Sequence, residues 1–199
     1  MSDQPIDSGK RTWIIASSCA GVVGAGFAAV PFVSSFEPSE RARAAGAPVE
    51  ADISALKEGE KTVVEWRGQP VWIVRRSQEQ VAELPKNDAL LADPKSLRNA
   101  DELTPSYARN EQRSIKPEYL VVVGICTHLG CSPTDRFTPG AQPSLPDDWA
   151  GGFLCPCHGS TFDMAGRVFK NKPAPDNLRV PPHTYLADTR LLIGEDSKA

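Results

Sequence analysis

Two short blocks in the second half of the chain hold most of the residues that could bind a metal. The first block, 126–131, reads CTHLGC, and the second, 155–160, reads CPCHGS. Together they contain four of the five cysteines and two of the three histidines. Each block places a cysteine close before a histidine, so two loops that face each other would supply two thiolates and two imidazoles. The candidate ligands are Cys126, His128, Cys155 and His158.

A two-iron, two-sulfur cluster of the Rieske type needs this set of ligands. One iron takes two thiolates and the other takes two neutral imidazoles. Because imidazoles replace two anionic thiolates, the oxidised cluster is less negative and accepts an electron more easily than an all-cysteine cluster. The sequence therefore predicts a single 2Fe-2S cluster that carries one electron at a time.

One cysteine remains in each block, Cys131 in the first and Cys157 in the second. A disulfide between them would tie the two ligand loops together. Closing a loop of about 27 residues stabilises a fold by a few kcal/mol in the chain-entropy model. A lasting disulfide also requires an oxidising compartment, which is the periplasm if the chain is bacterial.

A structural zinc ion is the main alternative for two cysteines and two histidines. Zinc gives no role to the two extra cysteines or to Ser160, and the Cys-x-His spacing is tighter than that of usual zinc ligand pairs, so we favour the iron–sulfur cluster. A Rieske-type oxygenase needs a second, mononuclear iron on two histidines and a carboxylate. His183 is the only histidine left, which excludes an oxygenase within this chain.

The N-terminal region contains a candidate membrane anchor. Residues 13–33 carry no charge, and at about 1.5 Å per residue they span a hydrocarbon core of roughly 30 Å. The run is long for a cleaved signal peptide, so an uncleaved anchor fits better. Lys10 and Arg11 favour a cytoplasmic N-terminus and could form a variant twin-arginine export signal, although Arg41 and Arg43 on the far side weaken the charge asymmetry.

The rest of the chain predicts a linker and a mainly β head. Residues 37–49 are rich in Ala, Pro and Gly, which is typical of a linker or of a short exposed helix. The runs 62–66 and 71–74 flank a turn with Gly68 and Pro70, which predicts a hairpin. The run 119–125 predicts a buried strand that leads into the first block. Helical turns are expected at 77–84, and further strands at 152–154, 167–169, 184–187 and 191–193.

The composition is that of a globular protein without a strong electrostatic preference. The net charge is only -3, with 22 basic and 25 acidic residues. No strong field therefore indicates nucleic acid as a partner. We expect an N-terminus on the cytoplasmic side over 1–12, an anchor over 13–34, a hinge linker over 35–50 and a head over 51–199, with the cluster-binding part at about 119–180.

The two blocks, the anchor and the linker together resemble the bacterial Rieske iron–sulfur subunit of cytochrome bc complexes, the ubiquinol–cytochrome c reductases. The resemblance implies one N-terminal transmembrane helix followed by an antiparallel, mainly β Rieske-type head, which contains a cluster-binding subdomain. It also implies the four ligands named above and a clamp disulfide. Ser160 matches a serine that donates a hydrogen bond to a bridging sulfide, and Leu129 matches an apolar residue that shields the cluster and docks on cytochrome b.

Two further matches concern the surroundings of the cluster. Residues 172–175, with Pro173 and Pro175, resemble a proline loop that covers the cluster, although Lys172 stands where the family often has Gly. Phe162 stands where many members carry a Tyr that hydrogen-bonds a ligand sulfur. Without that hydroxyl, the reduced cluster loses a stabilising donor, which predicts a lower potential than in Tyr-bearing relatives. The loop 132–154 between the blocks is longer than we expect of mitochondrial members.

The resemblance further implies a function within a membrane complex. The cluster would take one electron from ubiquinol at cytochrome b, with a proton to His158, and deliver the electron to a c-type cytochrome after a swing on the linker. The resembled complex is an enzyme, a dimeric, proton-translocating quinol–cytochrome c reductase, and this chain alone would hold no complete active site. The expected location is the bacterial inner membrane with the head in the periplasm. The alternative is the Rieske subunit of another exported oxidoreductase, such as arsenite oxidase.

Overall fold

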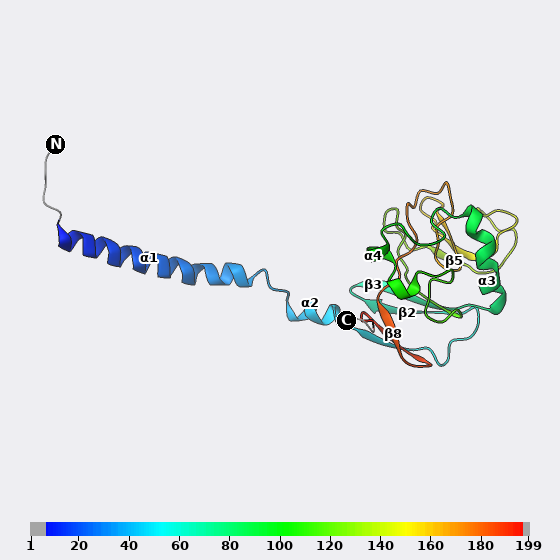
Figure 1. The fold of residues 1–199 in the computed structure, drawn as a ribbon, viewed down its shortest axis with the longest axis horizontal. Helices are drawn as coiled ribbons and strands as arrows, with labels where there is room; N and C mark the ends of the chain where they lie inside the picture. The colour runs from blue at the N-terminus through cyan, green and yellow to red at the C-terminus, as the bar shows by residue number, and fades with distance from the viewer. Residues whose placement is uncertain (1–6, 197–199) are drawn as a thin grey trace. The chain divides into compact units, whose positions relative to one another are not determined.

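The computed structural model describes residues 7–196, except for the side chains of residues 41, 45, 100 and 101. The chain divides into two compact units whose boundary lies between Ala44 and Ala45. Figure 1 shows a long N-terminal helix in the first unit and a β-rich second unit.

The first unit is dominated by helix α1, Ser8–Ser34. Asp7 caps its N-terminus by accepting hydrogen bonds from the backbone N–H groups of Gly9 and Lys10, which satisfies donors that have no partner inside the helix. The helix is long and apolar enough to cross a membrane. The expected N-terminal apolar span is therefore present. A short helix α2, Glu40–Ala45, follows.

The second unit is built from short antiparallel strands, and the prediction of a mainly β head is confirmed. Within the described residues the strands form three sheets of three. The first contains β1 (Val49–Asp52), β9 (Arg190–Ile193) and β8 (His183–Ala187); the second contains β2 (Lys61–Trp66), β3 (Gln69–Arg75) and β4 (Tyr119–Val123); the third contains β5 (Thr134–Arg136), β6 (Gly152–Leu154) and β7 (Thr161–Asp163). The helices are α3 (Gln78–Glu83) and α4 (Ala100–Leu103), with 3-10 turns at Leu84–Leu90 and Ser106–Ala108.

The second sheet lies between two hydrophobic cores. Side chains alternate between the faces of a strand, so Val71 and Ile73 of β3 enter one core with β1 and β9, whereas Trp72 and Val74 enter the other core beneath the ligand loops. Every residue of β4 is buried. Burial on both faces explains why the run 119–123 is continuously apolar instead of alternating.

The predicted hairpin is confirmed and is formed by β2 and β3. Its two-residue turn places Arg67 at φ 52° and Gly68 at φ 69°. Two successive residues with positive φ fit a type I′ turn, whose twist matches that of the flanking strands. Trp66 at the end of β2 and Trp72 in β3 are both buried.

The strand predicted at 167–169 is wrong. Among the described residues this segment makes two isolated bridges, Leu91 with Phe169 and Phe162 with Val168, and no named strand. The reason is the Arg167 side chain, which is fully buried and bonded to Asp163 across a tight turn. Strands β1, β5 and β7 were not predicted, because three or four residues with polar members carry little periodic signal.

Arg167 and Asp163 form an ion pair at 2.8 Å with neither side chain exposed. We expect Arg167→Met to lower the free energy of unfolding by about 3 to 5 kcal/mol, because Asp163 would remain as a buried charge without its partner. Urea unfolding of the detergent-solubilised chain, followed by circular dichroism, measures this. Lys86→Met is the control: its pair with Glu83 is largely exposed and should contribute less than about 1 kcal/mol. Equal losses in the two variants would contradict the prediction.

Candidate metal centre

The two ligand loops share one backbone pattern. In the first loop the Cys126 N–H donates to the Cys131 carbonyl at 2.8 Å, and the Cys126 carbonyl accepts from the Gly130 N–H at 3.1 Å. In the second loop the Cys155 N–H donates to the Ser160 carbonyl at 2.8 Å, and its carbonyl accepts from the Gly159 N–H at 3.0 Å. In each loop the first residue is therefore hydrogen-bonded to the fifth and the sixth residues of the block.

The glycine in each block is required by this closure. Gly130 has φ +80° and Gly159 has φ +73°, and a Cβ at either position would meet open space. Glycine is thus required by the positive φ and not by a lack of space for a side chain, because residues with a Cβ rarely adopt positive φ. The common CxxxG spacing of the two blocks reflects this shared turn.

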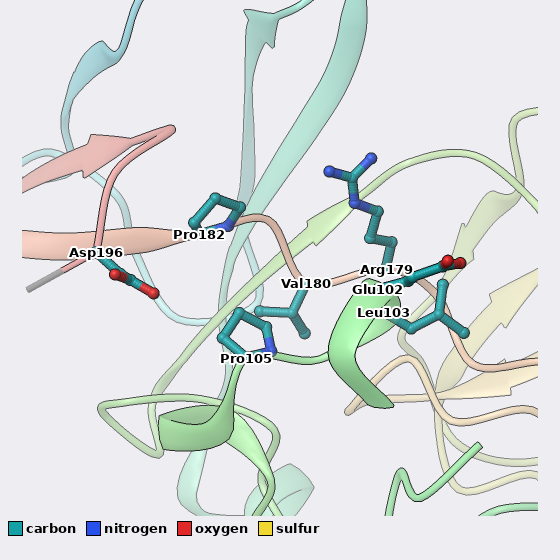
Figure 2. Close-up of a pocket in the computed structure, with 7 residues that line it drawn as sticks. All are labelled: Glu102, Leu103, Pro105, Arg179, Val180, Pro182 and Asp196. Atoms are coloured by element: carbon teal, nitrogen blue, oxygen red, sulfur yellow. The ribbon is translucent and has the colours of Figure 1, made fainter. Parts of the chain in front are cut away.

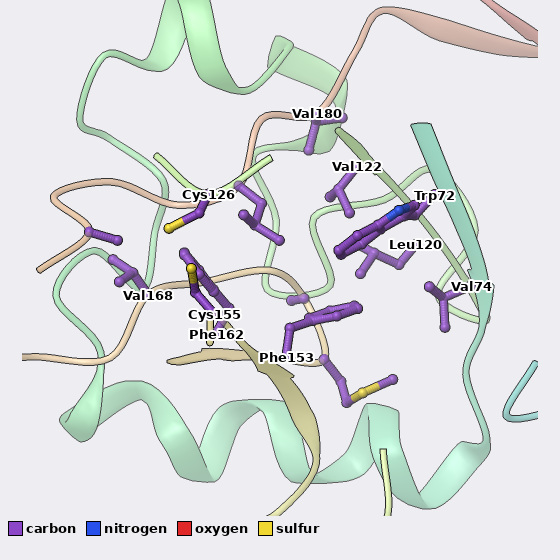
Figure 3. Close-up of a cluster of buried hydrophobic side chains, with 14 of the residues drawn as sticks. Trp72, Val74, Leu120, Val122, Cys126, Phe153, Cys155, Phe162, Val168 and Val180 are labelled. Atoms are coloured by element: carbon purple, nitrogen blue, oxygen red, sulfur yellow. The ribbon is translucent and has the colours of Figure 1, made fainter. Parts of the chain in front are cut away.

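The structure brings the four predicted ligands together. The rings of His128 and His158 lie 4.8 Å apart between centroids, edge to face. Cys126 and Cys155 are free and buried, and both belong to the core cluster that Figure 3 shows with Phe153 and Phe162. The histidines lie nearer the surface, and His158 is exposed. The thiols therefore face the protein interior and the imidazoles face outward.

The residues fit the cluster that the sequence predicts. The Nδ1 atom of His128 is buried and has no hydrogen-bond partner among the described residues, a costly arrangement that a metal bond would relieve. Burial raises the pKa of the Cys126 thiol, the backbone N–H of His128 opposes this, and the neighbouring Cys155 raises it again. Such a thiol pair becomes a pair of thiolates when a cation binds. In a Rieske centre, one iron would bind Cys126 and Cys155 and the other iron the two histidines.

Cys131 and Cys157 are joined by a disulfide, and their Cα atoms lie 6.6 Å apart. The sulfur atoms of Cys131, Cys155 and Cys157 lie within 4.8 Å of one another, but disulfide sulfurs do not act as thiolate ligands. The disulfide connects the end of the first ligand loop to the middle of the second. It therefore fixes the distance between the two loops.

The proline loop, residues 172–175, is tied to the second ligand loop. The Ala174 N–H donates to the Ser160 hydroxyl oxygen at 2.9 Å. Because this oxygen is already an acceptor, the Ser160 proton remains available for a further acceptor. Pro173 and Pro175 are exposed. Sequence reasoning missed Thr127, whose hydroxyl donates to the Asp176 carbonyl at 2.6 Å and ties the first ligand loop to the same segment.

The remaining predicted site residues lie on different sides of the centre. Phe162 is fully buried in β7 and packs in the core that contains the ligand cysteines (Figure 3). Leu129 is 70% exposed at the tip of the first loop. His183, the third histidine, lies in the edge strand β8 but is buried, and its Nδ1 atom is 2.8 Å from the Pro181 carbonyl oxygen.

Two features outside the centre complete the head. The long loop 132–154 packs around Trp149, which is buried and donates from Nε1 to the Arg136 carbonyl at 2.8 Å. A cavity of about 660 Å³ (Figure 2) has no ligand cysteine or histidine among the described residues that line it. Its lining consists of Glu102, Leu103, Pro105, Arg179, Val180, Pro182 and Asp196.

The disulfide yields a stability prediction. The variant Cys131→Ser/Cys157→Ser should lose about 3 kcal/mol of unfolding free energy in the chain-entropy model, because the two cysteines are 26 residues apart in sequence. Denaturant unfolding of the variant and of the parent chain, each with and without reductant, measures the loss. Cys19→Ser removes an exposed free thiol and should leave the midpoint unchanged. A midpoint that is insensitive to both the double substitution and reductant would refute the prediction.

Comparison with known proteins places the chain in a family. The model of the Rieske [2Fe-2S] domain matches residues 47–182. A second model, described as the "Ubiquitinol-cytochrome C reductase Fe-S subunit TAT signal", matches residues 13–39.

Curated relatives agree with these matches. The ubiquinol-cytochrome c reductase iron-sulfur subunit of Allochromatium vinosum is 60% identical over 94% of this chain and 88% of its own length. The proteins of the same name from Bradyrhizobium diazoefficiens and Rhodospirillum rubrum are 41% and 39% identical, over 90% and 94% of this chain and 90% and 93% of their own lengths. With this likeness along nearly its whole length, and with its paired Cys and His loops joined by a disulfide, the chain belongs to the family of Rieske [2Fe-2S] iron–sulfur subunits.

Proposed function

We propose that this chain is the electron-transfer subunit of a quinol:cytochrome c oxidoreductase. The observation that carries the proposal is the arrangement of two buried thiols opposite two outward-facing imidazoles, held in paired loops. A cluster bound there supplies one-electron transfer at a potential above that of an all-cysteine cluster. The electron would come from ubiquinol at cytochrome b and pass to a c-type cytochrome. The names of the relatives support this assignment.

His158 is the proposed contact with the quinol. His158 is exposed, whereas His128 is only partly exposed. A metal-bound imidazole keeps its second ring nitrogen for a hydrogen bond, and on His158 that nitrogen can reach a molecule outside the head. We propose that it accepts the hydrogen bond and then the proton of the quinol hydroxyl, while the electron moves to the cluster.

The surface around His158 suits docking on a membrane protein. Leu129 is 70% exposed, and Pro173 and Pro175 are exposed on the proline loop. Exposed apolar groups gathered near a redox site indicate a protein contact. We assign this contact to cytochrome b. The buried Ser160 and Phe162 are assigned to tuning the cluster from the interior side.

The proposed location is the bacterial inner membrane, with α1 as a single span, the N-terminus in the cytoplasm and the head in the periplasm. The disulfide supports the periplasm, because it needs an oxidising compartment. Lys10 and Arg11 before the apolar run support a cytoplasmic N-terminus. Residues 35–50 would act as a hinge on which the head swings from cytochrome b to the c-type cytochrome. The complex would be a dimer.

The decisive test is electron paramagnetic resonance of reduced membranes that contain the chain, titrated against potential with and without quinol-site inhibitors. We expect a Rieske-type signal with a positive midpoint that the inhibitors shift, because an inhibitor at cytochrome b would contact His158. A signal that no quinol-site inhibitor alters would assign the chain to another exported oxidoreductase, such as arsenite oxidase. Stoichiometric zinc without a signal would overturn the cluster itself.

Phe162 provides a second prediction. Phe162→Tyr should raise the midpoint potential, because a hydroxyl near the ligand sulfurs donates a hydrogen bond that stabilises the more negative, reduced cluster. The potential is measured by redox titration of the same spectroscopic signal. Phe153→Tyr is the matched control, since Phe153 belongs to the same buried core and pairs with Phe162 across β6 and β7. A midpoint in Phe162→Tyr equal to or below that of the parent chain would refute the prediction.

A further inference from the structure

The head contains an unusual set of buried charges. Among the described residues, five charged side chains are more than nine-tenths hidden from solvent. They are Arg76, Arg113, Arg167, Asp93 and Asp163. Three cations thus share the interior with two carboxylates. Burial of a charge costs free energy unless it is paired or hydrogen-bonded, so each arginine needs an explanation.

Among the described residues, the hydrogen bonds of the Arg113 side chain all go to neutral groups. Its guanidinium donates to the carbonyls of Ala165 at 3.0 Å, Gly166 at 3.2 Å and Leu178 at 2.7 Å, and to the Thr104 hydroxyl at 2.9 Å. Burial lowers the pKa of Arg113 to about 10, an effect that Asp163 opposes. A pKa near 10 still leaves the side chain charged at neutral pH. The positive charge is therefore present but is not cancelled by a bonded carboxylate.

This charge lies close to the metal centre. Arg113 donates to the Leu178 carbonyl at 2.7 Å, and the Asp176 carbonyl, two residues earlier, accepts from the Thr127 hydroxyl at 2.6 Å. Thr127 stands between the ligands Cys126 and His128. Two residues of chain span at most about 7 Å. The guanidinium is therefore within about 12 Å of Thr127 along a path that runs through protein.

We infer that the buried Arg113 charge favours the reduced form of the centre and so raises its reduction potential. The inference rests on the proposed function, because it requires a redox cluster between the ligand loops. Reduction adds one negative charge, which a buried cation attracts. Thr127 stands between two ligands, so we take its distance bound of about 12 Å as that of the cluster; with an effective dielectric constant of about 20, the attraction then changes the reduction equilibrium on the order of tenfold. A tenfold change corresponds to 59 mV for one electron.

The competing explanation is that Arg113 only fastens backbone segments together. Both explanations predict that substitution lowers stability, so stability cannot distinguish them. The potential can, if charge and hydrogen bonding are changed separately. Arg113→Lys keeps the charge and loses most of the hydrogen bonds, whereas Arg113→Gln loses both. Asp163→Asn removes a buried negative charge in nearly the same shape.

The experiment is a potentiometric titration of the Rieske spectroscopic signal in membranes that contain the full chain. Arg113→Gln should lower the midpoint by about 59 mV, a tenfold shift, and Arg113→Lys by less than half of that. Asp163→Asn should raise the midpoint, because it removes a buried negative charge. Damage to the fold alone does not explain a rise. This variant therefore tests the inference even if Arg113→Gln fails to fold. Arg109→Gln is the control: Arg109 is exposed and donates to the Thr104 carbonyl of the same segment, and solvent should screen its charge.

The outcomes distinguish a failure of the electrostatic role of Arg113 from a failure of the proposed electron-transfer function. Equal shifts in Arg113→Gln and Arg113→Lys, no shift in either, or a shift of the same sign in Asp163→Asn would overturn the electrostatic role and leave the cluster in place. A parent chain without any Rieske signal would overturn the proposed function and this inference together.

Discussion

The head depends on arginine side chains that satisfy buried backbone carbonyls. Buried peptide groups must find hydrogen-bond partners, and the irregular segments around the metal centre have few strand neighbours to provide them. Arg76 donates to the carbonyls of Pro117, Gln112 and Met164, and Arg113 to those of Ala165, Gly166 and Leu178. Five donors in a fixed plane allow one guanidinium to bind several chain segments at once. Polar loops can therefore be buried where a sheet would otherwise be needed.

The ligand loops are held by this framework. Ser160 accepts from the Ala174 N–H, and Thr127 donates to the Asp176 carbonyl, so both loops are bonded to the segment that Arg113 fastens at Leu178. The disulfide then fixes one loop against the other. A metal centre built on loops usually needs such supporting contacts to hold its ligands in position. Here the supporting segment is itself held by Arg113, which is 65 residues from Leu178 in the sequence.

The two sides of the centre face different environments. Cys126 and Cys155 belong to the hydrophobic core, whereas His158 and Leu129 lie at the surface. The buried side controls the electrostatics of the centre, because charges there are poorly screened. The exposed side is free for proton transfer and for contact with a partner. Under the proposed function, this division would let interior residues set the potential without altering the docking surface.

The sequence by itself determined the candidate ligands, the apolar span and the hairpin, because each depends on residues that are close together in the chain. The spacing of Cys, His and Gly in the two blocks specifies a local turn, and Arg67-Gly68 forms the two-residue turn between two apolar runs. Only the tertiary structure decided that Arg113 is buried beside the centre, that Thr127 bonds to residue 176, that His183 is buried and that 167–169 is not a strand. Thr127 and Arg113 depend on partners that are distant in the sequence: Asp176 is 49 residues from Thr127, and Leu178 is 65 residues from Arg113. Local patterns carry no signal for such contacts, because packing and long-range hydrogen bonds select them only when the whole head has folded.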